Sequence, residues 1–319
     1  PRIKLVCGSK PSKAWFYRFL KRHKAELALY RPSGLAPNRA QAFNPTVVAH
    51  HFELFRAEII AKYGIPPENL WNMDEKGVQL SGGRKQRREK YLFSRNKRPK
   101  YRIRSDKMEL VTIVECVSAT GAKMPPGFIF SGKTFDAGWF DQREKIGCVS
   151  LSPNGWTDDF LCMEWFQKVF IPKAKEYNTS GKPICLVFDG HGSHTAYEMI
   201  KLAREDGIHL YILPPHTTHY LQPLDVNVFG PLQNAWANRC DELVQLELEQ
   251  GSPEPVGMNR SILIEEYLNV REKTVTEANI TKAWEKCGLH PFNAGIFSGY
   301  DFGPCQASST GASFPASFP

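Results

Sequence analysis

Apolar residues recur every three to four positions in two segments near the N-terminus, which predicts two amphipathic helices. The first covers residues 13–31, with Ser12 as its N-cap and Pro32 as its end. The second runs from about Thr46 to Tyr63, where one stripe carries Val48, Phe52, Phe55, Ile59 and Tyr63. Turn-forming residues occupy 33–45. Such a stripe needs a partner, so we expect the second helix to pack on the main core or on a second subunit.

From position 70 to 230 the pattern changes to short apolar segments that are typical of strands. Residues 110–117 and 128–130 flank a turn at 119–121, which predicts a hairpin. Residues 184–188 are continuously apolar, as expected for a strand that is buried on both faces. A helical segment at 196–205 and a strand at 208–213 follow, and this order predicts a right-handed parallel crossover. The centre of the chain is therefore predicted to be α/β.

The C-terminal part is predicted to be helical. A long helix should run to about Gln250, and two shorter helices are expected near 260–273 and 276–287. Residues 298–319 are mostly Ser, Gly, Ala, Pro and Phe without periodicity, so we expect disorder there.

Positive charge is concentrated in one segment. The 319 residues carry a net charge of +8 and have a pI of about 9.0. Residues 84–107 contain twelve Lys or Arg and two acidic residues, a net of +10, so the rest of the chain sums to −2. A local block of this kind favours a nucleic-acid partner, and an exposed hairpin is the alternative. The candidate DNA-binding residues in this basic block are Arg84, Lys85, Arg87, Arg88, Lys97, Arg98 and Lys100.

The helix predicted at 13–31 also carries basic side chains. Arg18, Lys21 and Arg22 are candidates for contact with DNA, and a solvated basic face is the alternative.

Three aspartates are candidates for a metal site because they lie in separate segments that a sheet can bring together. Asp189 directly follows the apolar segment 184–188, while Asp74 and Asp225 lie in short motifs that contain apolar residues. Three carboxylates on rigid segments are hard oxygen ligands suited to two Mg²⁺ or Mn²⁺ ions, as in phosphoryl-transfer enzymes. An isolated Asp in such a position is more often a turn or helix cap. Glu75 should face the other side of its strand and have a structural role.

Four histidines form two His-x-x-His pairs, at His191 and His194 and at His216 and His219. A zinc site is one interpretation, but the pairs lack helical spacing and nearby cysteines. We instead expect His194 to contact a metal ligand, and His216 and His219 to contact loops or phosphates.

Cysteine usage and hydropathy indicate the compartment. The eight cysteines form no Cys-x-x-Cys pair, which indicates a reducing compartment without a disulfide framework. No segment approaches the roughly 18 apolar residues of a membrane span, and no signal peptide is visible, so we expect no membrane partner. The chain begins with Pro1, so we expect it to be a piece of a longer protein.

Three motifs of this chain resemble those of the pogo branch of the mariner-like DDE transposases. They are Asn72-Met73-Asp74-Glu75-Lys76-Gly77, Phe188-Asp189-Gly190-His191-Gly192-Ser193-His194, and the segment from Leu213 to Asp225 that ends in Leu221-Gln222-Pro223-Leu224-Asp225. The resemblance covers roughly 65–240. Residues 10–45 resemble the second half of a centromere-protein-B-type helix-turn-helix region, most clearly at 15–23.

The resemblance implies a ribonuclease-H-like mixed sheet flanked by helices, with Asp74, Asp189 and Asp225 as catalytic metal ligands. Many relatives have Asp-Asn-Ala-Pro-Ser-His where this chain has Asp189 to His194, so the middle residues differ. The implied organisation is a partial helix-turn-helix at 1–45, a linker helix at 46–65, an endonuclease core at 66–240, C-terminal helices at 241–297 and a disordered tail at 298–319.

The function implied by the resemblance is metal-dependent cleavage and transfer of DNA strands at transposon ends, in the nucleus. DNA is the expected partner, and a second copy of the chain is a further candidate. One alternative is a domesticated or decayed DNA-binding protein that keeps the fold without catalysis. Another is a nuclease that does not transpose.

Overall fold

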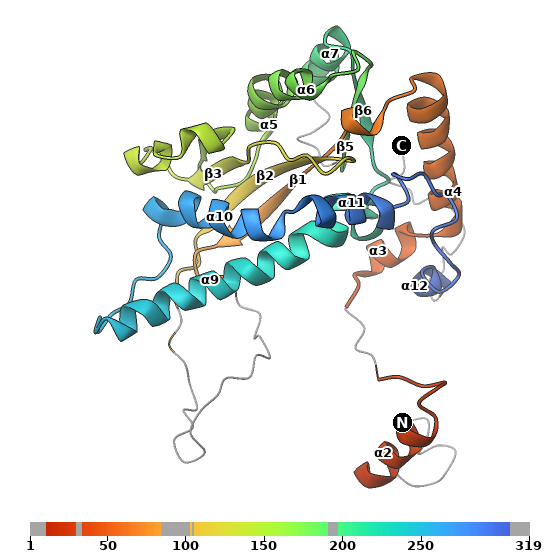
Figure 1. The fold of residues 1–319 in the computed structure, drawn as a ribbon, viewed down its shortest axis with the longest axis horizontal. Coiled ribbons are helices and arrows are strands. Elements are labelled where there is room, and N and C mark those ends of the chain that lie inside the picture. The colour runs from red at the N-terminus through yellow and green to blue at the C-terminus, as the bar shows by residue number, and fades with distance from the viewer. Residues whose placement is uncertain (1–10, 30–33, 84–102, 104, 191–196, 307–319) are drawn as a thin grey trace. The chain divides into compact units, whose positions relative to one another are not determined.

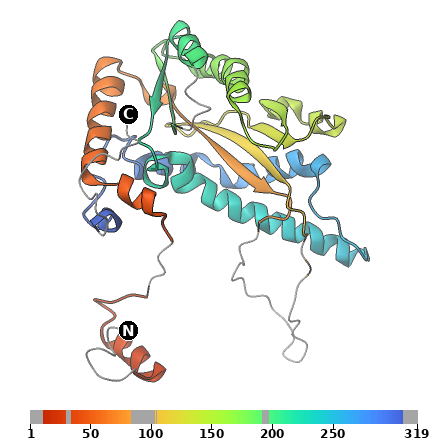
Figure 2. The same ribbon diagram turned by 180° about the vertical axis from the view of Figure 1, so that it is seen from behind.

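The computed structural model describes residues 11–29, 34–83, 103, 105–190 and 197–306. Its contacts divide the chain into two compact units, 1–36 and 37–319. Figures 1 and 2 show the elements of both units. None of the described helices is both long and apolar enough to cross a membrane.

The smaller unit contains helix α2 (Lys13–Arg22), whose N-terminus is capped as predicted. The side-chain oxygen of Ser12 accepts a hydrogen bond from the backbone N–H of Trp15. The helix ends at Arg22, well before the predicted end near position 31. No side chain of α2 is buried, and few apolar residues follow Leu20. Because helices depend on packing of an apolar face, the predicted last turns have little to stabilise them.

In the larger unit, the helix predicted at 46–63 is present as α4 (Pro45–Leu54) followed by the π-helix η1 (Phe55–Lys62). Its apolar stripe is buried in the main core, which confirms the packing expected for it. The preceding segment was predicted as turns, but it contains a short helix, α3 (Pro37–Ala42).

A six-stranded mixed sheet forms the centre of this unit, in the order β4-β3-β2-β1-β5-β6. Strands β1 and β2 and strands β2 and β3 are antiparallel, whereas the other neighbours are parallel. This mixed sheet, flanked by helices, confirms the predicted fold class. The strands are β1 (Leu70–Gln79), β2 (Leu110–Ser118), β3 (Gly127–Ser131), β4 (Cys148–Ser152), β5 (Ile184–Phe188) and β6 (Ile208–Ile212).

Burial explains which strands were predictable. All five residues of β5 are buried, as the continuous apolar segment predicts. The predicted hairpin is β2–β3, and Gly121 lies in its connection. Its φ is +95° and a Cβ there would meet Glu277 at 2.4 Å, so both the backbone and the space favour glycine. Strand β4 was not predicted, since it is a short edge strand with one buried residue.

Helices cover both faces of the sheet (Figure 1). One face packs against α5 (Asp159–Trp165), η5 (Phe166–Phe170), α6 (Ile171–Tyr177) and α7 (Tyr197–Glu205). The other packs against α4, η1, the π-helical turn η7 (Leu224–Val228), α9 (Phe229–Glu249), α10 (Arg260–Thr274) and α11 (Glu277–Lys286). Helix α7 connects β5 to β6 as predicted, and the three C-terminal helices match their predicted positions. Short elements are η2 (Pro67–Asn69), η3 (Ala137–Phe140), η4 (Arg143–Lys145) and α8 (Thr218–Leu221).

The tail predicted to be disordered is structured in its first part. Residues 298–306 are described and include α12 (Gly303–Gln306), where Cys305 is buried. The ring of Phe302 stacks on Phe43 with centroids 5.2 Å apart. The composition of the tail could not predict this contact, because Phe43 lies far from Phe302 in the sequence.

Candidate active site

The three aspartates lie on segments that converge beside the middle of the sheet. Asp74 is in β1, Asp189 directly follows β5, and Asp225 is the second residue of η7. Strands β1 and β5 pair only through Leu70–Asn72 and Cys185–Val187. Beyond this point β1 pairs only with β2, so Asp74 and Asp189 both follow the end of the β1–β5 pairing.

The electrostatics of Asp74 show that the three carboxylates interact. Burial raises the pKa of Asp74 well above its ordinary value, and the charges of Asp225 and Asp189 raise it further. The backbone N–H of Glu75, 2.8 Å from Asp74 Oδ1, partly opposes this shift. Two of the three aspartates that sequence motifs had singled out therefore lie near enough to Asp74 for their charges to act on it.

Gln222 is a neighbour of this site that sequence reasoning missed. Its side chain is fully buried, and its amide lowers the pKa of Asp74 by favouring the charged carboxylate. Neither amide atom has a partner at normal hydrogen-bond geometry in the described part of the chain. The only sequence signal was its place in the motif that ends at Asp225, which does not distinguish it from its neighbours.

The chemistry of the donor set fits a hard divalent cation. All three donors are carboxylates, and a cation would offset the repulsion that disfavours the charged form of Asp74. Within the described ranges, no three His, Cys, Asp or Glu side chains are close enough to hold a metal ion together. The carboxylates thus interact through space without forming a finished ligand cluster.

Replacing Asp74 with Asn is expected to stabilise the metal-free protein at pH 7. Because the folded state raises the pKa of Asp74, the protonated side chain contributes more to folding stability than the charged one. This contribution is lost as pH rises through the folded-state pKa, whereas Asn stays uncharged at every pH. For the parent, Mn²⁺ at about 100 times its Kd should add about 2.7 kcal/mol. The same Mn²⁺ concentration should raise the free energy of unfolding of Asp74→Asn much less. Urea denaturation with Mn²⁺ or EDTA measures both effects.

Glu75→Gln is the matched control, because alternation along β1 places Glu75 on the opposite face of the sheet. It should keep the full Mn²⁺ effect. An equal loss in both variants would contradict the assignment of Asp74.

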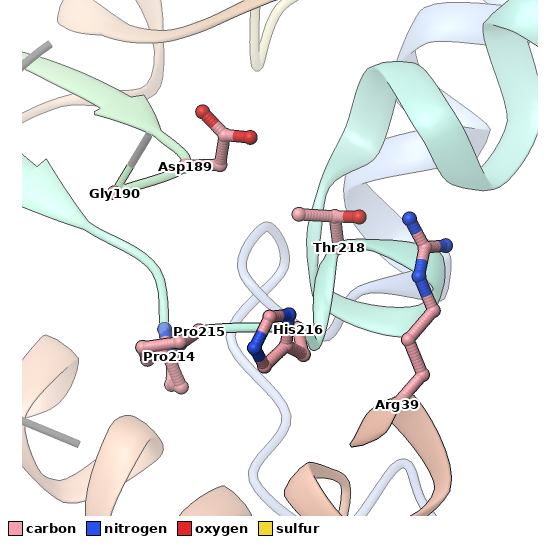
Figure 3. A pocket seen from close by; sticks show the side chains of 7 residues that line it. All are labelled: Arg39, Asp189, Gly190, Pro214, Pro215, His216 and Thr218. Atoms are coloured by element: carbon pink, nitrogen blue, oxygen red, sulfur yellow. The ribbon is translucent and has the colours of Figure 1, made fainter. Parts of the chain in front are cut away.

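A pocket of about 280 Å³ opens beside Asp189, lined also by Arg39, Gly190, Pro214, Pro215, His216 and Thr218. Figure 3 shows Asp189 and Gly190 on one side and Arg39 on the other, with His216 and Thr218 between them. Arg39 is exposed, and it comes from α3, in a segment predicted to be rich in turns. The pocket therefore combines a carboxylate with a cationic guanidinium.

The histidines have different environments. His216 lines the pocket with a left-handed backbone, at φ 63°. Burial, together with the charge of Arg39, lowers the pKa of His219 to about 4, so this ring is neutral at pH 7. His219 packs edge-on against Phe43 with centroids 5.9 Å apart. His191 and His194 lie outside the described residues.

The basic residues are placed only in part. Arg18, Lys21 and Arg22 are exposed on α2. The seven candidates of the basic block, Arg84, Lys85, Arg87, Arg88, Lys97, Arg98 and Lys100, lie outside the described residues.

Two kinds of known proteins resemble this chain. The chain is 28% identical over 237 residues to the MFS-type transporter clz9 of Cochliobolus lunatus, covering 74% of this chain and 25% of that protein. It is 25% identical over 191 residues to the human (Homo sapiens) Pogo transposable element with KRAB domain, covering 56% of this chain and 29% of that protein. The chain thus spans about a quarter of the length of these relatives.

Among solved structures, the Mos1 Strand Transfer Complex aligns with a TM-score of 0.49 at 11% identity, over 88% of this chain and 68% of that one. The Mos1 transposase paired-end complex with left transposon end aligns with a TM-score of 0.47 at 12% identity, over 90% and 72%.

The chain also matches a protein family. The family described as DDE superfamily endonuclease matches residues 107–284, which is more than half of the chain and includes Asp189 and Asp225. This confirms the predicted resemblance at the level of the family, while the centromere-protein-B-type region stays a prediction. The chain belongs to the DDE superfamily endonuclease family.

Proposed function

We propose that the chain is the catalytic core of a DNA transposase, which cuts and transfers DNA strands at transposon ends with the help of divalent metal ions. The observation that carries this proposal is the raised pKa of Asp74, which results from burial and then from the charges of Asp225 and Asp189. The charges of two carboxylates thus act on a third from a separate segment, in a chain of the DDE endonuclease family. Such an arrangement suits phosphoryl transfer.

Asp74, Asp189 and Asp225 would hold Mg²⁺ or Mn²⁺. A pair of such ions supplies a nucleophile of lowered pKa and stabilises the leaving oxygen of the phosphate. The aspartates fix where this charge lies, with Asp189 as the candidate for a shared ligand because it follows the fully buried β5. His194 is proposed to contact one of these carboxylates.

The pocket beside Asp189 would receive the DNA backbone. Arg39 is exposed on the wall opposite Asp189, and a guanidinium can bind a phosphate through two parallel hydrogen bonds. Thr218, with its hydroxyl, and Gly190, with its backbone N–H, are further lining residues that carry hydrogen-bond donors. These groups would orient the strand while the carboxylates face the scissile phosphate.

Two basic regions are proposed to hold the DNA. The basic block at 84–107 supplies most of the positive charge. Arg18, Lys21 and Arg22 on α2 would belong to a helix-turn-helix region that contacts DNA. Such a protein acts in the nucleus, and a second copy of the chain is the proposed further partner.

The direct test is nicking of a supercoiled plasmid that carries the element's own ends. The 319-residue chain is expected to convert it to the open-circular form with Mn²⁺ and not with EDTA. A chain that binds this DNA but never nicks it would be the domesticated binder. Equal nicking of plasmids with and without the ends would indicate a nuclease that does not transpose.

Replacing Arg84, Lys85, Arg87 and Arg88 with Ala is expected to weaken DNA binding and flatten its salt dependence. Each lost phosphate contact lowers the slope of log K against log salt by about 0.9 on duplex DNA. Fluorescence anisotropy between low and moderate salt measures the slope.

A matched control removes the same charge from lysines that already pair with carboxylates, namely Lys62, Lys168, Lys173 and Lys175. Its slope should stay close to that of the parent. If the two quadruple variants behave alike, only net charge matters and the basic block is a solvated surface.

A further inference from the structure

Asn72 is a buried polar residue in β1 that joins three segments of the site. Its side-chain Nδ2 donates to the carbonyl oxygen of Val187 at 2.9 Å. Its Oδ1 accepts from the backbone N–H of Leu224 at 3.0 Å. The side chain has no exposed surface, so water does not compete for these bonds.

The bonded residues lie next to the three aspartates in sequence. Asn72 is two residues before Asp74, Val187 is two residues before Asp189, and Leu224 directly precedes Asp225. A shift of any one segment would therefore both break a hydrogen bond of Asn72 and move a carboxylate.

The position of Asn72 explains why a side chain is needed there. The backbone pairing of β1 with β5 ends at Asn72 and Val187. The helical turn η7 begins at Leu224, and Pro223 before it provides no side-chain cap. One amide thus satisfies a carbonyl at the end of a strand pairing and an N–H at the start of a helix, two groups that would otherwise be buried without partners.

We propose that Asn72 is a positioning residue that holds the β1, β5 and η7 segments together, so that their carboxylates can share metal ions; the metal part of this role rests on the proposed function. Asn72 touches no reacting atom. It acts through the backbone of Val187 and Leu224, which lie in the segments that carry Asp189 and Asp225.

The same strand region offers a buried asparagine for comparison. Asn69 is also fully buried, and its Nδ2 donates to the carbonyl of Lys182 at 2.9 Å and to Asn178 Oδ1 at 3.0 Å. It fixes the loop before β5, and among the described residues its side chain donates only to the segment 178–183 and not to η7. Loss of Asn69 should therefore cost stability without disturbing the aspartates.

The test compares Asn72→Leu with Asn69→Leu in the 319-residue chain. Leu has a similar volume and forms no side-chain hydrogen bonds, so both variants lose the buried hydrogen bonds of a side-chain amide. The first measurement is amide hydrogen exchange in EDTA. Around Leu224 and around Asp189, exchange should accelerate about tenfold or more in Asn72→Leu and stay near the parent rate in Asn69→Leu.

The second measurement is Mn²⁺ affinity by calorimetry. Groups that orient metal ligands typically contribute 10- to 100-fold in affinity, so Asn72→Leu should weaken Mn²⁺ binding by about this factor and Asn69→Leu should not. If Asn72→Leu fails to fold, Asn72→Ser keeps one hydroxyl and serves as the milder variant.

The outcomes separate the two proposals. Unchanged exchange around Leu224 and Asp189 in a folded Asn72 variant overturns the positioning role, whatever the metal data show. Equal Mn²⁺ affinity in the two Leu variants also overturns it. A parent chain that binds no Mn²⁺ overturns the proposed function, while hydrogen exchange still decides whether Asn72 holds the segments together.

Discussion

Replacing Asp225 with Asn is expected to reduce Mn²⁺-dependent nicking by a factor on the order of 10³ and to leave the fold intact. Asn keeps the shape of the side chain but loses the charge that would hold a metal ion. Catalysis of phosphoryl transfer depends mostly on positioning and charge, so the substitution should lower the rate of strand cleavage itself. Asp225 is exposed in the first turn of η7, so its replacement removes no core packing.

Asp159→Asn is the matched control, because Asp159 is likewise an exposed aspartate in the first turn of a helix, α5. It should nick at the parent rate, and circular dichroism should show both variants folded. Equal activity of Asp225→Asn and the parent would place the third ligand elsewhere. Glu198 and Glu205 on α7 would then be the first residues to replace.

Much of the larger unit was predictable because its pattern is local. The stripe of α4 and η1 and the apolar segment of β5 are each determined by residues close in sequence. Strand β4 and helix α3 escaped prediction because they are short. The order around α12 also escaped, since Phe302 finds Phe43 only after the chain has folded.

The site divides in the same way. The aspartates were identified from sequence motifs, and in the structure the charges of Asp225 and Asp189 act on Asp74. Arg39 and Gln222 were not singled out, because an exposed Arg in a turn-rich segment and a Gln within a motif carry no distinctive pattern. Asn72 lay inside a quoted motif, but its role comes from bonds to residues more than 100 positions away. Only the fold shows such pairings.

Replacing Arg271 with Met is expected to destabilise the protein by about 3–5 kcal/mol at pH 7, because it leaves the charge of Glu115 buried and unpaired. Glu115 has no exposed surface, and its carboxylate accepts from Arg271 Nε at 2.7 Å and Nη2 at 2.8 Å. The hydroxyl of Tyr267 also donates to it, at 2.7 Å. Glu115 lies directly opposite Asp74 in the β1–β2 register, so this pair anchors α10 under the strands of the site.

Urea denaturation followed by circular dichroism tests this against Arg239→Met. Arg239 also pairs with a glutamate through two bonds, to Glu266, but its side chain is 29% exposed, and the expected loss is about 1 kcal/mol or less. The double variant Glu115→Gln with Arg271→Met should recover much of the loss, because no unpaired charge stays buried. A double variant no more stable than Arg271→Met would contradict this explanation, since lost packing and not the stranded carboxylate would then dominate.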